Sequence, residues 1–283
     1  MGRSAALDRV NCTDIAFQEK NYTEDLSLEM GDFHYHSCYE IYYLFSGERR
    51  YLIDYDFFDI STGDIVLIKK NKLHMTKRIK NPYGDNIKIY IAEEAFDRLG
   101  KSSEMFKECF EYNHVVIPTA YKKKFFSLFS KIQNEYKKST PFSEQITHNL
   151  LYELLANIHD LLFNDTQQIS TAREESNDTI TKAIKYIYNH YNQNINLSNI
   201  AKYVNTNPSY FSRTFKKTLG LSLTDYINHI RIKNAVSLIV NTDLPITEIA
   251  YNCGYTDQTY FCKIFKKIND CSPREFRKQN LRL

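Results

Sequence analysis

The feature that most constrains this chain is a stretch of sequence that occurs twice in its C-terminal part. Segment 200–207 aligns with 249–256, and after a one-residue insertion segment 210–217 aligns with 260–267. In each copy the spacing of apolar residues predicts a helix, a short turn and a second helix. The repeat therefore predicts an all-α C-terminal domain that contains two helix-turn-helix units.

Local signals predict where the second helix of each copy begins. Asn207 is predicted to cap this helix in the first copy, with Pro208 in its first turn. In the second copy Thr256 is the predicted cap, and Asp257 suits the positive end of the helix that comes next. The turn before each of these helices contains a residue type that tolerates left-handed backbone, Asn205 or Gly254.

Each second helix is predicted to bury a pair of phenylalanines and to expose a polar face. The Phe side chains are four residues apart, at 211 and 215 and at 261 and 265, so each pair shares one side of its helix. Arg and Lys side chains can bond guanine, Gln can pair with adenine, and hydroxyls can serve either base. The polar faces are therefore either ordinary solvated surfaces or, as two matched copies favour, surfaces that read the DNA major groove. The predicted base-reading residues are Ser209, Ser212, Arg213, Gln258, Thr259 and Lys263, and the predicted phosphate contacts are Lys216, Lys217, Lys266 and Lys267.

The distribution of charge supports a polyanionic partner for this part of the chain. The whole chain has 37 Lys+Arg and 34 Asp+Glu, a net charge of only +3. Residues 177–283 carry 15 basic and 7 acidic side chains, net +8, which leaves 22 basic and 27 acidic, net −5, for residues 1–176. This asymmetry is typical of a nucleic-acid-binding part joined to a part with another role. The polar segment 164–176 between them is predicted to be a linker.

Between the two copies, the 18 residues from Leu223 to Val240 are predicted to form one helix. Its length of ~27 Å could hold two recognition helices about one DNA turn, ~34 Å, apart. Several segments then resemble the DNA-binding domain of the AraC/XylS family of transcription regulators. They are 207–217, 231–235, 246–250, 254–258 and 272–276. The chain departs from the family pattern at Asn205 and Asp270, where Gly is frequent, and at Lys263, where Lys lacks the bidentate fork of Arg.

The N-terminal part has the alternating pattern of an antiparallel β domain. Short apolar runs at 40–45, 50–54 and 64–68 are separated by turn signals, which predicts a small barrel or sandwich. His34 and His36 are two residues apart and are predicted to point to one face of a strand, where Glu40 and His74 could join them.

These residues resemble the two cupin motifs, which agrees with the cupin-like sensor domains of AraC-family regulators. In metal-binding cupins the matching positions, here His34, His36, Glu40 and His74, form a three-histidine, one-carboxylate metal site. The second motif is imperfect at Lys69 and Asn71, and our preferred interpretation is a ligand pocket without a cofactor. Polar and aromatic linings suit a hydroxylated molecule such as a sugar. The predicted pocket residues are His34, His36, Glu40, Tyr42, Tyr51, His74 and Tyr90.

Two helices are predicted after the β domain, at 120–138 and 142–163. The second carries an apolar stripe that is wider than packing against one small barrel needs. Either the stripe packs against the barrel, or, as the resemblance favours, these helices form the contact of a homodimer. The stripe consists of Ile146, Leu150, Leu151, Leu154, Leu155, Ile158, Leu161 and Leu162.

Together these patterns predict an α+β chain of two domains. The predicted divisions are a cupin-like antiparallel β-barrel for ligand sensing at 1–118, a helical hairpin at 119–163, a linker at 164–176 and an all-α double helix-turn-helix domain at 177–283. The predicted function is a sequence-specific, ligand-responsive transcription regulator and not an enzyme, with operator or promoter DNA, a small effector and, as a further candidate, RNA polymerase as partners. The alternatives are a metal-dependent cupin enzyme with a nucleic-acid-binding tail and an architectural DNA binder.

Composition narrows the cellular setting that we expect. No apolar run approaches the ~18 residues of a membrane span, and the first 20 residues lack the order of a signal peptide. The six cysteines include no Cys-x-x-Cys pair, so they are expected to be reduced thiols. These observations predict a cytoplasmic protein without a membrane partner.

Overall fold

The computed structural model describes residues 15–22, 33–79, 84–138, 140–164 and 179–280. The chain divides into two compact units. The first, which we call the β unit, comprises Val10–Asp32 and His36–Glu174; the second, the helical unit, comprises Met1–Arg9, Phe33–Tyr35 and Glu175–Leu283. Except for Asn164, the predicted linker lies outside the described residues.

The strands of the β unit form two antiparallel sheets within the described residues. One has five strands in the order β1-β7-β2-β5-β8, and the other has three in the order β4-β3-β6. Their ladders do not join into a closed ring over the described part of the chain, so the predicted barrel takes the form of two sheets. The strands are β1 (Ile15–Tyr22), β2 (Tyr39–Leu44), β3 (Glu48–Ile53), β4 (Asp56–Ser61), β5 (Ile65–Ile68), β6 (His74–Arg78), β7 (Gly84–Ile91) and β8 (His114–Val115).

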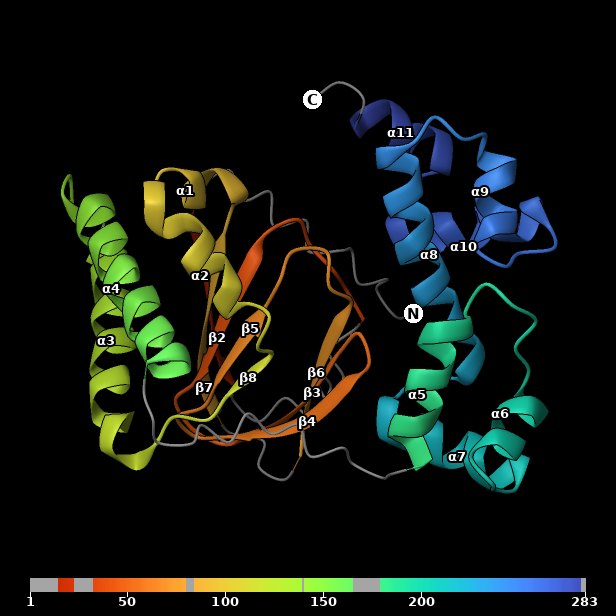
Figure 1. Ribbon diagram of the computed structural model, residues 1–283, viewed down its shortest axis with the longest axis horizontal. Helices are drawn as coiled ribbons and strands as arrows, with labels where there is room; N and C mark the ends of the chain where they lie inside the picture. Colours follow the sequence, from red (N-terminus) through yellow and green to blue (C-terminus); the bar gives the residue numbers. More distant parts are fainter. Residues whose placement is uncertain (1–14, 23–32, 80–83, 139, 165–178, 281–283) are drawn as a thin grey trace. The chain divides into compact units, whose positions relative to one another are not determined.

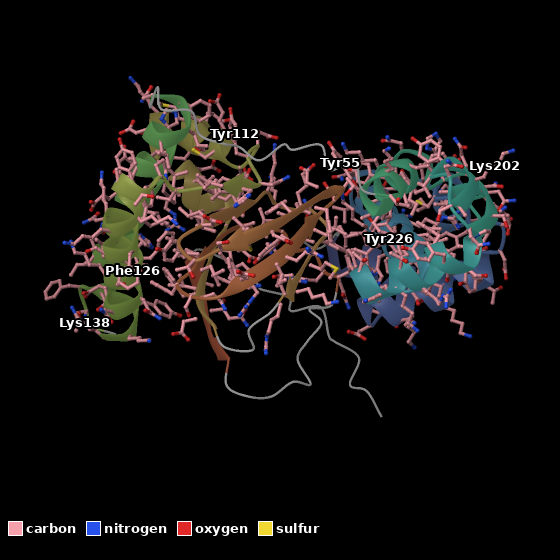
Figure 2. All side chains as sticks on the ribbon, turned by 90° about the horizontal axis from the view of Figure 1, so that it is seen from below. Tyr55, Tyr112, Phe126, Lys138, Lys202 and Tyr226 are labelled. Carbon is pink, nitrogen blue, oxygen red and sulfur yellow. The ribbon has the colours of Figure 1, made fainter. Side chains whose placement is uncertain are left out.

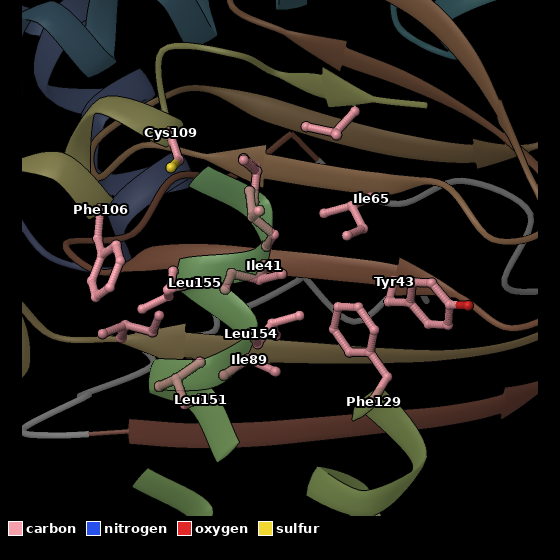
Figure 3. Packing of buried hydrophobic residues seen from close by; sticks show 14 of the residues in the cluster. Ile41, Tyr43, Ile65, Ile89, Phe106, Cys109, Phe129, Leu151, Leu154 and Leu155 are labelled. Carbon is pink, nitrogen blue, oxygen red and sulfur yellow. The ribbon is translucent and has the colours of Figure 1, made fainter. Parts of the chain in front are cut away.

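Alternation along the strands gives the five-stranded sheet two different faces. Odd-numbered residues such as Ile41, Tyr43 and Ile89 belong to a core shared with helices, whereas even-numbered residues such as Tyr42, Leu44 and Val66 join a second cluster with β3 and β4. Figure 3 shows the first cluster, with Ile41 and Tyr43 facing side chains of the helices. We call the side of the second cluster the interior of the β unit. The helices are α1 (Glu93–Asp97), α2 (Ser103–Cys109), α3 (Thr119–Lys138) and α4 (Ser143–Phe163), with a 3-10 turn at Gly100–Ser102.

Helices α3 and α4 run side by side along the outer face of the five-stranded sheet (Figure 1). Most residues of the predicted apolar stripe of α4 are buried in the core that the helices share with the sheet. The buried ones are Leu151, Leu154, Leu155, Ile158 and Leu161. Leu150 and Leu162 are only partly buried, and Ile146 is 40% exposed. Figure 2 shows Phe126 and Lys138 of α3 at the outer margin of the unit. An exposed apolar remnant is therefore left on the hairpin.

The helical unit has the predicted double arrangement. Helices α6 (Leu197–Tyr203) and α7 (Pro208–Leu219) form the first copy, and α9 (Ile246–Asn252) and α10 (Gln258–Asn269) form the second. The long α8 (Leu223–Asn241) joins them, with α5 (Thr179–His190) before the first copy and α11 (Pro273–Asn280) after the second (Figure 1). The predicted fold class, an antiparallel β domain with a helical hairpin and an all-α double helix-turn-helix domain, is confirmed.

The helix starts agree with the predicted caps except at one position. Asn207 Oδ1 accepts the amide hydrogens of Ser209 and Tyr210 at 2.9 and 3.3 Å. In the second copy the predicted cap Thr256 is wrong, because the Asp257 carboxylate accepts the Thr259 amide at 2.7 Å and is the cap. Thr256 and Asp257 are adjacent and both are favoured as caps, so the sequence could not distinguish between two helix starts one residue apart.

None of the described helices is long and apolar enough to cross a membrane. Among the described residues, Cys38, Cys109, Cys253, Cys262 and Cys271 form no disulfide. Cys12 lies outside the described residues.

Candidate functional site

Helix α7 presents the predicted reading face of the first copy. Phe211 and Phe215 are buried, at 1% and 0% exposure, which fixes the orientation of the helix in the unit. On the other side Ser209 and Arg213 are exposed and Ser212 is half-buried. Lys216 and Lys217 lie in the last turn and are also exposed. The predicted base-reading residues therefore share one accessible face, with the lysines at its end.

Helix α10 repeats this arrangement with different side chains. Thr259, Lys263 and Lys266 are exposed on the side away from the buried Phe261 and Phe265. Two predicted contacts are already engaged within the unit. Gln258 is half-buried and its Oε1 accepts the Thr247 hydroxyl at 3.0 Å, and the Lys267 ammonium lies 4.0 Å from the Asp225 carboxylate.

A polar junction links the two copies through α8. Arg231 donates from Nε to the Tyr191 carbonyl at 2.7 Å and from Nη2 to the Gln193 carbonyl at 2.8 Å, just before the first copy. The same guanidinium lies over the Tyr255 ring of the second copy, 5.3 Å from its centroid. One side chain of α8 thus contacts both the segment that leads into the first copy and the turn of the second copy.

Asn228, one turn before Arg231 on α8, adds to this junction. It is buried, its Oδ1 accepts the Tyr255 hydroxyl at 3.1 Å, and its Nδ2 donates to the Tyr260 hydroxyl at 3.3 Å. Tyr260 lies in the first turn of α10 and is 43% exposed, next to the predicted reading face. Sequence analysis missed these residues, because nothing in the repeat indicates which α8 side chains face the second copy.

Three predicted residues of the N-terminal motif meet within the β unit. The ligand atoms of His36, Glu40 and His74 all lie within 4.8 Å of one another, whereas His34 belongs to the segment Phe33–Tyr35 of the helical unit. Glu40 on β2 and His74 on β6 come from different sheets and are 0% and 1% exposed. The expectation that His34 and His36 share a regular strand is wrong, because both precede β2, which begins at Tyr39. The sequence motif therefore predicts the convergence of these residues but not the backbone that carries them.

Hydrogen bonds define the orientation of the two buried imidazoles. Nδ1 of His36 lies 2.9 Å from the Cys38 carbonyl, and Nδ1 of His74 lies 2.8 Å from the Lys72 carbonyl. A carbonyl can only accept, so each Nδ1 carries a proton and donates. Both Nε2 atoms are then left to face Glu40, at 2.9 Å from Oε2 for His36 and 3.6 Å for His74.

Lys88 is a buried cation in this cluster that sequence analysis missed. Its Nζ lies 3.4 Å from Glu40 Oε1, and the side chain is 9% exposed. Burial alone would raise the pKa of the Glu40 carboxyl, but the Lys88 ammonium and the two imidazoles outweigh it and hold this pKa well below its usual range. Burial lowers the pKa of His74 and is only partly opposed by Glu40. The interior therefore holds a charged carboxylate with a paired ammonium beside it.

The predicted tyrosines line the same interior in two places. The Tyr90 ring lies edge-on to His36, with centroids 5.2 Å apart, and the Tyr90 hydroxyl donates to Gln18 Oε1 at 3.2 Å. Tyr42 and Tyr51 instead pack against each other, with ring centroids 5.3 Å apart, in the apolar cluster between the sheets. Apart from His34, the predicted pocket residues thus form a polar group, which includes Tyr90, and an aromatic pair.

The polar group also fits a metal ion in one respect. An imidazole that donates Nδ1–H to a backbone carbonyl presents Nε2 for coordination, which is the usual arrangement of metal-binding histidines. A proton or a cation between His36 Nε2 and Glu40 Oε2 would satisfy both atoms. The Lys88 ammonium opposes a metal, because it already compensates the charge of Glu40.

Family comparisons match both units of the chain. A model of the AraC-like ligand binding domain matches residues 28–176, and a helix-turn-helix domain model matches residues 200–279. The first match covers the β unit from β2 to the end of the hairpin but not β1, and the second covers both copies of the repeat. The predicted resemblance is confirmed by these two matches.

Individual relatives carry the names of regulators. An uncharacterized HTH-type transcriptional regulator of Escherichia coli, YijO, is 31% identical over 49% of this chain and 48% of its own length. The Msm operon regulatory protein of Streptococcus mutans is 27% identical over 85% of this chain and 84% of its own. The arabinose operon regulatory protein of Escherichia coli is 31% identical over 56% of this chain and 52% of its own length. The chain thus spans about half the length of two of these relatives. All three names are those of regulators.

Proposed function

Because the chain belongs to the AraC family of transcriptional regulators, we propose that α7 and α10 read one operator together and that a small effector in the interior of the β unit controls their binding. DNA is the partner of the helical unit, and a small molecule is the partner of the β unit. Residues of the two recognition helices and of the buried polar group perform these roles.

The observation that carries the DNA proposal is the pair of exposed polar faces on two equally long helices. Helices α7 and α10 have 12 residues each, and side-chain oxygens cap both. Their candidate base contacts include Arg213 in the first copy and Lys263 in the second, and exposed lysines extend both faces toward phosphates. At 19 residues, α8 is long enough, ~28 Å, to hold the two copies near successive major grooves ~34 Å apart.

Operator geometry gives the direct test of this proposal. Binding sites of the full chain would be mapped across the genome, and the site recovered would be used in fluorescence anisotropy. We expect affinity to fall to that of a single half-site when about 5 base pairs, half a turn, are inserted between the half-sites. Unchanged affinity would contradict reading by both helices. Equal affinity for operator and random DNA would favour the architectural alternative.

The effector proposal rests on the buried polar group of the β unit. Its imidazoles, carboxylate and ammonium offer hydrogen-bond donors and acceptors, and Tyr90 adds a ring beside His36. This chemistry suits a hydroxylated molecule, with a sugar as the first candidate. The names of the Msm operon and arabinose operon regulators support a search among carbohydrates.

The metal alternative predicts different behaviour of the purified protein. If the polar group is an effector site, the purified protein should carry well under one equivalent of transition metal, and chelators should leave operator binding intact. His36→Ala should then abolish only the response to the effector. A metal site would retain close to one equivalent, and His74→Ala would release it and destabilise the β unit. Elemental analysis after dialysis separates the two, and stoichiometric iron, manganese or zinc would overturn the effector-only interpretation.

We propose further that the chain acts as a homodimer in the cytoplasm, with the α3–α4 hairpin as the contact and RNA polymerase as an additional partner. The exposed remnant on the hairpin, which includes Ile146 and Phe142 at 40% and 73% exposure, supports the dimer. We also propose the domain boundaries predicted from the sequence, which follow residues 118, 163 and 176. Sedimentation velocity at tens of micromolar should give the dimer mass, and Ile146→Glu should give the monomer; a wild-type monomer would contradict it.

A further inference from the structure

A groove on the outer side of the β unit lies apart from the polar group of the interior. It has a volume of about 240 Å³ and lies between β1 and the turn that joins α3 to α4. Its lining residues are Ile15, Phe17, Tyr136, Thr140, Ser143, Glu144, Thr147 and His148. Ile15 and Phe17 belong to the outer face of the sheet, so the groove does not open into the interior where the effector is proposed to bind.

One side of the groove is aromatic and apolar. The Phe17 and Tyr136 rings pack against each other, with centroids 4.4 Å apart and planes inclined by 38°. Ile15 extends this surface along β1. A flat apolar group bound here would contact two rings, and ring faces also attract cations.

The other side presents acceptors from the first turns of α4. Thr147 is 4% exposed, and its hydroxyl has no hydrogen-bond partner in the described residues. A buried hydroxyl without a partner costs free energy, so a ligand that supplies the missing hydrogen bond gains affinity there. The Glu144 carboxylate, one turn earlier on the helix, is exposed at the same groove.

The charge of the groove indicates which ligands it can hold. Its lining residues, all of them described, include a carboxylate but no lysine or arginine. Nearby, the buried Glu135 is already satisfied, since it accepts the Ser143 hydroxyl at 3.1 Å and pairs with Lys138 at 2.6 Å. Glu144 is therefore the lining charge that remains available, and it favours a cation over an anion.

We propose that this groove is a second small-molecule site, specific for a primary amine with an aromatic or similarly flat apolar group. The apolar group packs against Phe17 and Tyr136, and the ammonium donates to the Thr147 hydroxyl and to the Glu144 carboxylate. The volume admits roughly ten non-hydrogen atoms, which is smaller than the usual drug-sized ligand. This site does not depend on the proposed effector site in the interior.

The test uses three compounds of nearly equal size on the full chain: 2-phenylethylamine, 2-phenylethanol and phenylacetate. Isothermal titration calorimetry at neutral pH should give an affinity for the amine about tenfold higher than for the alcohol, and higher still than for the anion. Equal affinities, preference for phenylacetate, or no amine binding at about 10 mM would overturn the proposal.

Variants locate the binding within the groove. Thr147→Val keeps the shape of the side chain and removes the hydroxyl, and Glu144→Gln removes the charge; each should weaken amine binding about five- to tenfold. Glu153→Gln, an exposed carboxylate of α4 outside the groove, is the matched control and should change nothing. His36→Ala should also preserve amine binding, which separates this site from the interior. Amine binding unaffected by both groove variants would refute the assignment.

Discussion

The two helix-turn-helix copies share one plan but differ in how tightly their turns are packed. Both turns contain a residue in left-handed conformation, Asn205 at φ 53° and Gly254 at φ 84°. Asn205 is exposed. A Cβ atom built on Gly254 would lie 2.7 Å from the carbonyl oxygen of Asn192 and 2.8 Å from its carbonyl carbon. The first turn needs only a tolerant backbone, whereas the second also needs the absence of a side chain.

The reason for this difference is the junction between the copies. Asn192 lies between Tyr191 and Gln193, whose carbonyls accept the guanidinium of Arg231. The same segment therefore contacts α8 and the turn of the second copy. The two copies have similar sequences but unequal constraints, because the turn of the second copy packs against the segment that precedes the first copy.

Among the substitutions that test this difference, Gly254→Ala should have the largest effect on stability. Alanine in left-handed conformation is strained and its Cβ would clash with Asn192, so the free energy of unfolding of the helical unit should fall by about 3 kcal/mol. Asn205→Ala is the matched control and should cost only about 1 kcal/mol, because its side chain meets no such obstacle. Hydrogen exchange of amides in α8 and α10 of the full chain measures both. If both substitutions lowered the free energy of unfolding equally, the proposed difference between the two turns would be wrong.

Arg231→Ala tests whether the junction sets the orientation of the copies. Loss of two hydrogen bonds from a charged group should lower the free energy of unfolding by about 2 kcal/mol. We also expect the complete operator to lose more affinity than an isolated half-site, because the relative placement of α7 and α10 is relaxed. Fluorescence anisotropy with both DNAs provides the measurement. Equal losses would show that Arg231 supports the fold without setting the geometry.

Sequence reasoning was most successful where the structure depends on local signals. The cap at Asn207 and the left-handed residues at 205 and 254 agree with residue type and position alone. The error at Thr256 is an ambiguity of one residue between neighbouring good caps. The close approach of Asn192 to Gly254 was not predictable, because it depends on packing between segments far apart in the sequence.

In the β unit, the motif predicted most of the residues that meet in the polar group but missed one of them, Lys88. The resemblance to the cupin motifs predicts that His36, Glu40 and His74 meet, as they do. Lys88 joins them because β2 pairs with β7 in a register that sets Tyr42 opposite Lys88 and Glu40 opposite Tyr90. The alternation of Asn86, Lys88 and Tyr90 with isoleucines could have indicated a lysine on the inner face. The register itself is nonlocal, and neither strand specifies it alone.

Arg213→Ala sharpens the comparison of the two reading faces. Loss of a bidentate base contact should lower operator affinity by ~1–3 kcal/mol and relax preference at one base pair. Arg213→Lys should lose most of this discrimination, since Lys, the residue already present at 263, has no planar fork. Lys216→Ala is the control, expected to weaken operator and random DNA alike and to reduce the salt slope by about 1. Equal losses on both DNAs for Arg213→Ala would contradict its assignment as a base contact.

The smallest expected effect concerns the residue that ends each recognition helix. Gly220 ends α7 at φ 76°, and Asp270 ends α10 at φ 59°. Left-handed backbone costs Asp a modest amount of free energy, so Asp270→Gly should raise the free energy of unfolding by about 0.5 kcal/mol, whereas Gly220→Ala should lower it by about 1 kcal/mol. The amides that donate to the carbonyls of Lys216 and Lys266 close these two ends, and their hydrogen exchange would report the change. Destabilisation by Asp270→Gly would mean that the carboxylate makes a stabilising contact at this end, and the C-terminal ends of the two helices would then differ in more than residue type.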